Sequence, residues 1–143
     1  MVAIAALTAL ATARSAAAHI VALPAFVASG SSESVTFSGP NERDVPMTGF
    51  ALVLPAGLQI AHAHEVDGWD ESVDGQTATW LGGPLAPTEE IGFGITLDAE
   101  LEPGVVELQA VQRYADGNEV SWPVSLTITP EEESPSQNLA LAS

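Results

Sequence analysis

Three histidines are the residues of this sequence best suited to metal chemistry, and they are His19, His62 and His64. The chain has no cysteine, so any metal would be held by nitrogen and oxygen donors, and no cysteine nucleophile or disulfide is available. Phosphate-binding loops, a Gly-x-Ser-x-Gly elbow and a His-Glu-x-x-His motif are also absent from the sequence. The common enzyme signatures therefore fail, and no nucleophile or proton-transfer pair is indicated.

His19 becomes a stronger candidate ligand if it is the first residue of the mature chain. Residues 1–18 (MVAIAALTALATARSAAA) combine an apolar run of the length of a signal-peptide core with a small-residue end that suits cleavage by a signal peptidase. The run is too short to span a bilayer by itself. We therefore expect residues 1–18 to be a signal peptide that is removed during export. The alternative is an alanine-rich first helix of the fold.

Cleavage after Ala18 would give His19 two metal-binding nitrogens, its free α-amine and its imidazole Nδ1. The amine has an ordinary pKa of about 8, so it loses its proton at little cost near neutral pH. Two nitrogens of one residue, completed by carboxylate or water oxygen, suit Cu(II), which also stands highest in the affinity order of the first-row divalent metals. Without cleavage, a lone histidine in a strand is ordinary surface decoration.

His62 and His64 lie two residues apart in the segment AHAHE. On a strand they would point to the same face and could hold a metal between them. The plainer interpretation is an exposed strand edge, because weak two-histidine pairs arise by chance.

Two loop carboxylates and three tryptophans complete the candidates. Glu42 and Asp44 lie in the segment GPNERD, a loop in which carboxylates are ordinary. Trp69, Trp80 and Trp122 are expected first of all to fill the core, since the chain has only four phenylalanines and one tyrosine.

Strands are the elements that must position these residues, because apolar residues recur with period two from His19 onward. The clearest run contains Val120, Trp122, Val124, Leu126 and Ile128. The run before it contains Val106, Leu108, Ala110 and Tyr114, and Asp116-Gly117 between the two runs predicts a hairpin. With about seven or eight strands separated by glycine and proline turns, the pattern predicts one all-β domain over residues 19–129, an antiparallel immunoglobulin-like β-sandwich.

Composition restricts the partners of this domain. The chain has 19 acidic residues against three basic ones and a formal charge of -16. Nucleic acids are bound largely through Lys and Arg that neutralise phosphates, so we expect no nucleic-acid partner, and anionic membranes are disfavoured for the same reason. Residues 130–143 (PEEESPSQNLALAS) are predicted to be an acidic disordered tail, and the last residues, Leu139 to Ser143, fall far short of the ~20 apolar residues that a membrane span needs.

Several short motifs follow one another in a recognisable order. They are Ala18-His19-Ile20-Val21, Pro40-Asn41-Glu42-Arg43, Pro55-Ala56-Gly57, Asp67-Gly68-Trp69, Trp80-Leu81-Gly82-Gly83, and Tyr114-Ala115-Asp116-Gly117 leading to Trp122. In this order and spacing the chain resembles the YcnI-type copper-binding domain family of bacterial secreted and membrane-anchored proteins. The resemblance covers His19 to about Trp122, which is nearly the whole expected mature domain.

The resemblance implies a β-sandwich that binds Cu(II) through a single-histidine brace. His19 matches the brace, Glu42 matches the carboxylate that completes it, and Trp122 matches the tryptophan beside the metal. The family consists of secreted, periplasmic or cell-surface copper handlers rather than enzymes, so the implied partners are copper and other copper-trafficking proteins. The C-terminal transmembrane anchor that is common in the family has no counterpart in this sequence.

Two other functions remain open at this point. One is a copper monooxygenase, which would need a second histidine across the site, and only His62 or His64 could supply it. The other is a metal-free adhesion or interaction sandwich. Copper titration of a chain that begins at His19 would separate these possibilities.

Overall fold

The computed structural model describes residues 20–131, which form ten strands and no helix. The prediction of an all-β domain is therefore confirmed. No helix within residues 20–131 is long and apolar enough to cross a membrane. The predicted signal peptide, His19 and residues 132–143 of the predicted tail lie outside the described residues.

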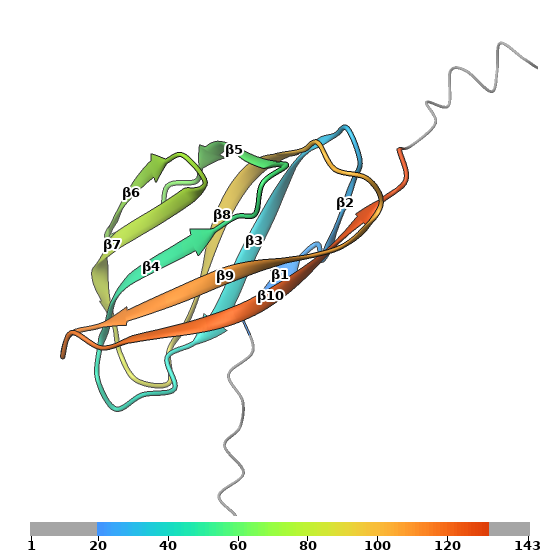
Figure 1. The fold of residues 1–143 in the computed structure, drawn as a ribbon. Coiled ribbons are helices and arrows are strands. Elements are labelled where there is room, and N and C mark those ends of the chain that lie inside the picture. The colour runs from blue at the N-terminus through green and yellow to red at the C-terminus, as the bar shows by residue number, and fades with distance from the viewer. Residues whose placement is uncertain (1–19, 132–143) are drawn as a thin grey trace, which may run out of the picture.

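The strands form two sheets that pack face to face (Figure 1). The four-stranded sheet has the order β1-β3-β8-β5 and consists of β1 (Val21–Leu23), β3 (Ser32–Pro40), β8 (Glu90–Ala99) and β5 (Leu58–Ala63). The six-stranded sheet has the order β2-β10-β9-β4-β7-β6 and consists of β2 (Phe26–Ala28), β10 (Glu119–Thr129), β9 (Gly104–Tyr114), β4 (Met47–Val53), β7 (Thr77–Leu85) and β6 (Trp69–Asp74).

The sheets are antiparallel, as predicted, except at one edge. β1 pairs antiparallel with β3 in one sheet, and after two intervening residues β2 pairs parallel with β10 in the other. The chain thus changes sheets within Val21–Ala28, which gives two three-residue strands that the period-two pattern was too short to reveal. This division is one reason why the structure has more strands than the sequence predicted.

The core lies between the sheets, where the inward side chains of both are buried. Its centre is aromatic: Phe50 and Phe93 stack with ring centroids 4.5 Å apart, and Trp69 and Trp80 each lie 5.1 Å from Phe93. The expectation that Trp69 and Trp80 fill the core is confirmed. Trp122 differs, because it is only partly buried and packs against the margin of the core.

β9 and β10 form the predicted hairpin around Asp116 and Gly117, with Arg113 opposite Glu119 at its closed end. Gly117 has φ of 85°, a conformation that glycine adopts without steric cost. Alternation along β10 also follows the prediction, since Val124, Leu126 and Ile128 are buried. The hairpin brings the start of β10, with Trp122, beside the end of β9.

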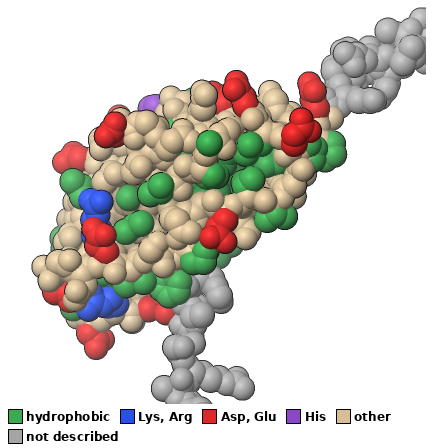
Figure 2. All heavy atoms as spheres, viewed as in Figure 1, with side chains coloured by type: hydrophobic (Ala, Val, Ile, Leu, Met, Phe, Trp, Pro, Cys, Tyr) green, Lys and Arg blue, Asp and Glu red, His purple; other side chains and the backbone are tan. Residues whose placement is uncertain are grey.

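Acidic side chains are spread over the surface, whereas the two described arginines lie at the end of the sandwich where the β9–β10 hairpin closes (Figure 2). Both arginines pair with carboxylates: Arg43 with Asp116, and Arg113 with Glu119. The pair of Arg43 with Asp116 joins the loop after β3 to the β9–β10 hairpin, two parts of the chain that are far apart in sequence.

Candidate functional site

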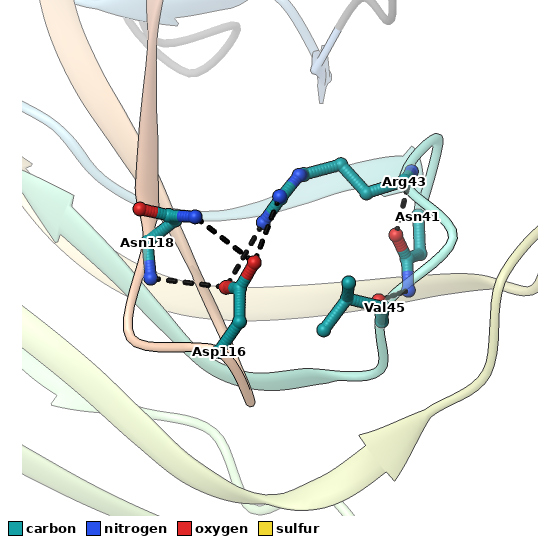
Figure 3. Close-up of polar contacts among 5 residues, drawn as sticks. All are labelled: Asn41, Arg43, Val45, Asp116 and Asn118. Carbon is teal, nitrogen blue, oxygen red and sulfur yellow. Dashed lines mark hydrogen bonds and ion pairs between the residues drawn. The ribbon is translucent and has the colours of Figure 1, made fainter.

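The loop after β3 is held by a buried asparagine. The Asn41 amide donates from Nδ2 to the carbonyl oxygen of Val45 at 2.9 Å, and its Oδ1 accepts the backbone N–H of Arg43 at 3.0 Å (Figure 3). The same Nδ2 also donates to the carbonyl oxygen of Leu85 at 3.1 Å. An asparagine that bonds its own backbone two residues on closes a tight turn. The turn leaves the next side chain, Glu42, exposed to solvent.

An ion pair fastens this loop to the β9–β10 hairpin. Arg43 donates to Asp116 with both terminal nitrogens, Nη1 at 3.1 Å and Nη2 at 2.9 Å, and Asp116 also accepts the backbone and side-chain N–H groups of Asn118 (Figure 3). The Arg43 guanidinium carbon lies 4.6 Å from the centre of the Tyr114 ring, within the range of a cation–π contact. A bidentate pair of this kind fixes orientation as well as distance.

The same contacts shift the acid–base behaviour of the pair. The Arg43 hydrogen bond, with further hydrogen bonds from Asn118, holds the pKa of the Asp116 carboxyl well below its usual range. The hydrogen bond to Asp116 also raises the pKa of Arg43. Both side chains remain about one-third exposed, so water and salt screen their attraction. The pair therefore fixes the loop's position more than it stabilises the fold.

A buried glutamine connects the hairpin to β3. Gln112 is 1% exposed on the inward face of β9. Its Oε1 accepts the indole N–H of Trp122 at 2.9 Å and the hydroxyl of Tyr114 at 3.0 Å, and its Nε2 donates to the carbonyl oxygen of Pro40 at 3.3 Å. The role of Gln112 was not predicted from the sequence. The available signal was a polar side chain in phase with the buried positions Leu108, Ala110 and Tyr114.

Glu42 and Trp122 both adjoin the group formed by Arg43, Gln112 and Tyr114. Burial is the main cause that raises the pKa of the Tyr114 hydroxyl, while Arg43 lowers this pKa and the Glu42 carboxylate raises it. Glu42 is adjacent in the chain to Arg43, whose guanidinium carbon lies 4.6 Å from the centre of the Tyr114 ring. Trp122 shares its hydrogen-bond acceptor, Gln112, with the same phenol. Among residues 20–131, the Glu42 carboxylate forms no ion pair. The structure therefore brings Glu42 and Trp122 to one end of the sandwich.

The start of the described chain lies at this end as well. Val21 of β1 pairs with Ser38, so the chain before Val21 runs toward Gly39 and Pro40. β1 also contacts β10, the strand that carries Trp122. Ile20 is buried beside the core.

The histidine pair occupies the opposite edge of the four-stranded sheet. The rings of His62 and His64 are neighbours, with centroids 5.7 Å apart, as expected for one side of a strand. The Nε2 atom of His64 lies 2.9 Å from Oγ1 of Thr96, and its ring lies over Gly94, where an added β carbon would come within 2.5 Å of Nδ1. His62 is exposed. Within residues 20–131 there is no group of three or more His, Asp or Glu side chains that could hold a metal ion.

No protein-family model and no curated protein matches the chain. Solved structures do match it. An uncharacterized protein from Nocardia farcinica with an immunoglobulin-like fold has a TM-score of 0.65 and 24% identity, over 78% of this chain and 97% of that one. A non-cellulosomal cohesin from the archaeon Archaeoglobus fulgidus has a TM-score of 0.53 and 17% identity, over 85% of this chain and 96% of the cohesin.

A third match is AvmM, which catalyses macrocyclization in alchivemycin A biosynthesis, with a TM-score of 0.50 and 15% identity over 82% of this chain and 90% of AvmM. At such identities these likenesses show the fold alone, an immunoglobulin-like and cohesin-like β-sandwich. Because a cohesin and a catalyst share this architecture, the fold by itself does not decide between binding and catalysis.

Proposed function

We propose that this chain is an extracytoplasmic Cu(II)-binding protein of copper handling, secreted, periplasmic or attached to the cell surface, and not an enzyme. His19, as the first residue after cleavage, and Glu42 hold the metal, and Trp122 lies beside it. The observation that carries the proposal is the convergence of the loop with the exposed Glu42, of Trp122 and of the start of β1 on one end of the sandwich, which the contacts of Arg43 and Gln112 establish.

The covalent chain limits how far His19 can lie from this end. Its Cα is about 3.8 Å from that of Ile20, as in any trans peptide. Ile20 is buried beside the core, and the chain there runs toward Pro40, two residues before Glu42. We therefore propose that the amine and imidazole of a mature His19 reach the Glu42 carboxylate.

The donor chemistry of these residues suits Cu(II). Two nitrogens from His19 and one carboxylate oxygen from Glu42 form the mixed nitrogen and oxygen set that Cu(II) prefers in a tetragonal arrangement, and Zn(II) binds such a set more weakly. An exposed carboxylate without an ion-pair partner among residues 20–131 can turn to a cation without first losing another contact. When bound, copper would be held as cargo.

Trp122 has a different part in the proposal. Its indole nitrogen carries a hydrogen and has no lone pair to give, so it is a hydrogen-bond donor only, and that hydrogen is already given to Gln112. The ring is partly exposed at the margin of the core. Trp122 therefore shields the metal from solvent and does not ligate it.

The motif order supports the same assignment. The residues that resemble the YcnI-type family in separate stretches of the sequence, Pro40 to Arg43, Tyr114 to Gly117 and Trp122, are joined here by the hydrogen bonds of Gln112 and the ion pair of Arg43. The monooxygenase alternative gains no such support. It requires His62 or His64 to face His19, and β5 lies at the edge of the sheet opposite β1.

The test is Cu(II) titration by isothermal calorimetry of proteins that begin at a native His19: the parent, His19→Ala, Glu42→Gln and the double variant His62→Ala/His64→Ala. We expect one Cu(II) per parent chain, a loss of affinity of at least about 100-fold for His19→Ala and about tenfold for Glu42→Gln. The double variant should bind as the parent does. Retained binding in His19→Ala with loss in the double variant would place copper on β5, and no binding in the parent would favour the metal-free interaction sandwich.

A further inference from the structure

Gln112 stands out in the structure because its side chain is polar, neutral and almost completely buried. It lies at an inward position of β9, in line with Leu108 and Ala110, where the alternation of the strand calls for an apolar residue. A buried amide is costly unless its donors and acceptors are satisfied. Gln112 meets this requirement with three partners from three strands: Tyr114, Trp122 and Pro40.

The chemistry of these partners fixes which way the amide points. The indole N–H of Trp122 can only donate and needs an acceptor, whereas the carbonyl oxygen of Pro40 needs a donor. The oxygen of Gln112 must therefore face the indole and its nitrogen must face Pro40, and the Tyr114 hydroxyl, which can donate or accept, donates to the same oxygen. Turning the amide over would set an N–H group against the indole N–H and the amide oxygen against the carbonyl oxygen of Pro40. One arrangement alone satisfies all four groups.

We propose that Gln112 is a positioning residue of the copper site, which fixes the plane of the Trp122 indole and the end of β3 without touching the metal. Its oxygen holds the indole by its N–H, and its nitrogen holds the backbone at Pro40, from which the chain turns within two residues to Glu42. One side chain thus sets the relative placement of the shielding ring and of the strand that leads to the carboxylate. This inference rests on the proposed function.

The experiment uses Gln112→Met, which keeps the length of the side chain and removes both its donor and its acceptor. Gln109→Met is the matched control, because Gln109 lies on the same strand but bonds only to Glu107 and Ser121 on the exposed surface. We expect Gln112→Met to weaken Cu(II) binding about tenfold, or about 1.4 kcal/mol, in a chain that begins at His19. Gln109→Met should leave the affinity unchanged.

A second readout needs no copper. The indole N–H signals of the three tryptophans in 15N-labelled protein report hydrogen bonding, and Trp122→Phe identifies the signal that belongs to Trp122. In Gln112→Met we expect the Trp122 N–H to exchange with water at least about ten times faster, since it has lost its acceptor. The Trp80 signal is an internal control, because that N–H bonds to the backbone of His64 instead.

A copper effect of the same size in the Trp122→Phe background would mean that Gln112 does not act through the indole, and this part of the proposal would be wrong, with only the contact to Pro40 left to carry the effect. The whole proposal would be wrong if the Trp122 exchange rate and the copper affinity are both unchanged in Gln112→Met. If the parent binds no Cu(II), the proposed function fails and the copper role of Gln112 fails with it. The exchange rates would then still show whether Gln112 orients the ring.

Discussion

Candidate metal ligands occur at two places in this chain, and the two places differ in whether the donor atoms are already engaged in other contacts. At the end that carries Glu42 and Trp122, hydrogen bonds and an ion pair engage the surrounding residues and leave the Glu42 carboxylate exposed. At the edge that carries His62 and His64, one ring nitrogen of His64 is bonded to Thr96 and the other lies against Gly94. Residue type and spacing point to both places. The availability of donor atoms favours a metal site at the end that carries Glu42 and Trp122.

The difference between the two places is tested most directly by extending the chain in front of His19 with a residue whose own amine is blocked. An N-acetylglycine converts the α-amine of His19 into a peptide nitrogen and supplies no new amine, so we expect at least about a 100-fold loss of Cu(II) affinity. Copper titration of the extended and native proteins measures the loss. Unchanged affinity in the extended protein would exclude the amine as a ligand and return His62 and His64 to consideration.

The pH profile of copper binding sharpens the same distinction. An amine and an imidazole lose protons near about 8 and about 6.5, so a site with both should weaken progressively as pH falls from about 8.5 to 5.5. A site made only of imidazoles should weaken only near and below about 6.5. Competition titrations at constant ionic strength give the profile, and the double variant His62→Ala/His64→Ala should follow the parent curve.

Gly94→Ala tests the role of the histidine edge. The new methyl group would lie 2.5 Å from Nδ1 of His64, so the ring must move, and we expect a loss of about 1–3 kcal/mol in the free energy of unfolding. Urea unfolding measures this change. Combining Gly94→Ala with His64→Ala should recover most of the loss, and copper affinity should remain that of the parent. A large drop in copper affinity for Gly94→Ala would link the two regions.

The smallest expected effect concerns the ion pair between Arg43 and Asp116. Because hydrogen bonding lowers the pKa of Asp116 in the folded protein, its contribution to stability is present above its ordinary pKa of about 3.9 and is lost as pH falls further. Thermal unfolding of the parent and of Asp116→Asn should therefore differ slightly and constantly above pH of about 4. The difference should narrow in more acidic buffers, and a difference that widened there would contradict this assignment.

Alternation and turn residues were enough to predict the sandwich, the β9–β10 hairpin around Asp116-Gly117 and the inward face of β10, because these signals lie close together in sequence. It was not enough for β1 and β2, which are three residues each and lie in different sheets. The division of Val21–Ala28 between the sheets depends on the positions of β3 and β10, which a local sequence pattern does not indicate.

The candidate site was predictable only in part for the same reason. Glu42 and Trp122 were named from a resemblance, and the structure places them at one end of the molecule, while His19 lies outside the described residues and its role remains a prediction. Gln112 and Asn41 were missed. Their burial depends on partners that come from distant segments, Pro40 for Gln112 and Leu85 for Asn41, so nothing adjacent in the sequence indicates it.

The parallel pairing of β2 with β10 has a mechanical consequence. Backbone hydrogen bonds join the strands near both ends of β2, from Thr127 N to Ala25 O at 2.9 Å and from Ser29 N to Thr129 O at 2.8 Å. Parallel strands carry the chain in the same direction, so a pull on the chain before β2 and an opposite pull on the chain after β10 would slide one strand along the other. The hydrogen bonds, which lie across the strands, would then bear the load together and not open one by one. Tension between β2 and the end of β10 would therefore load this edge in shear.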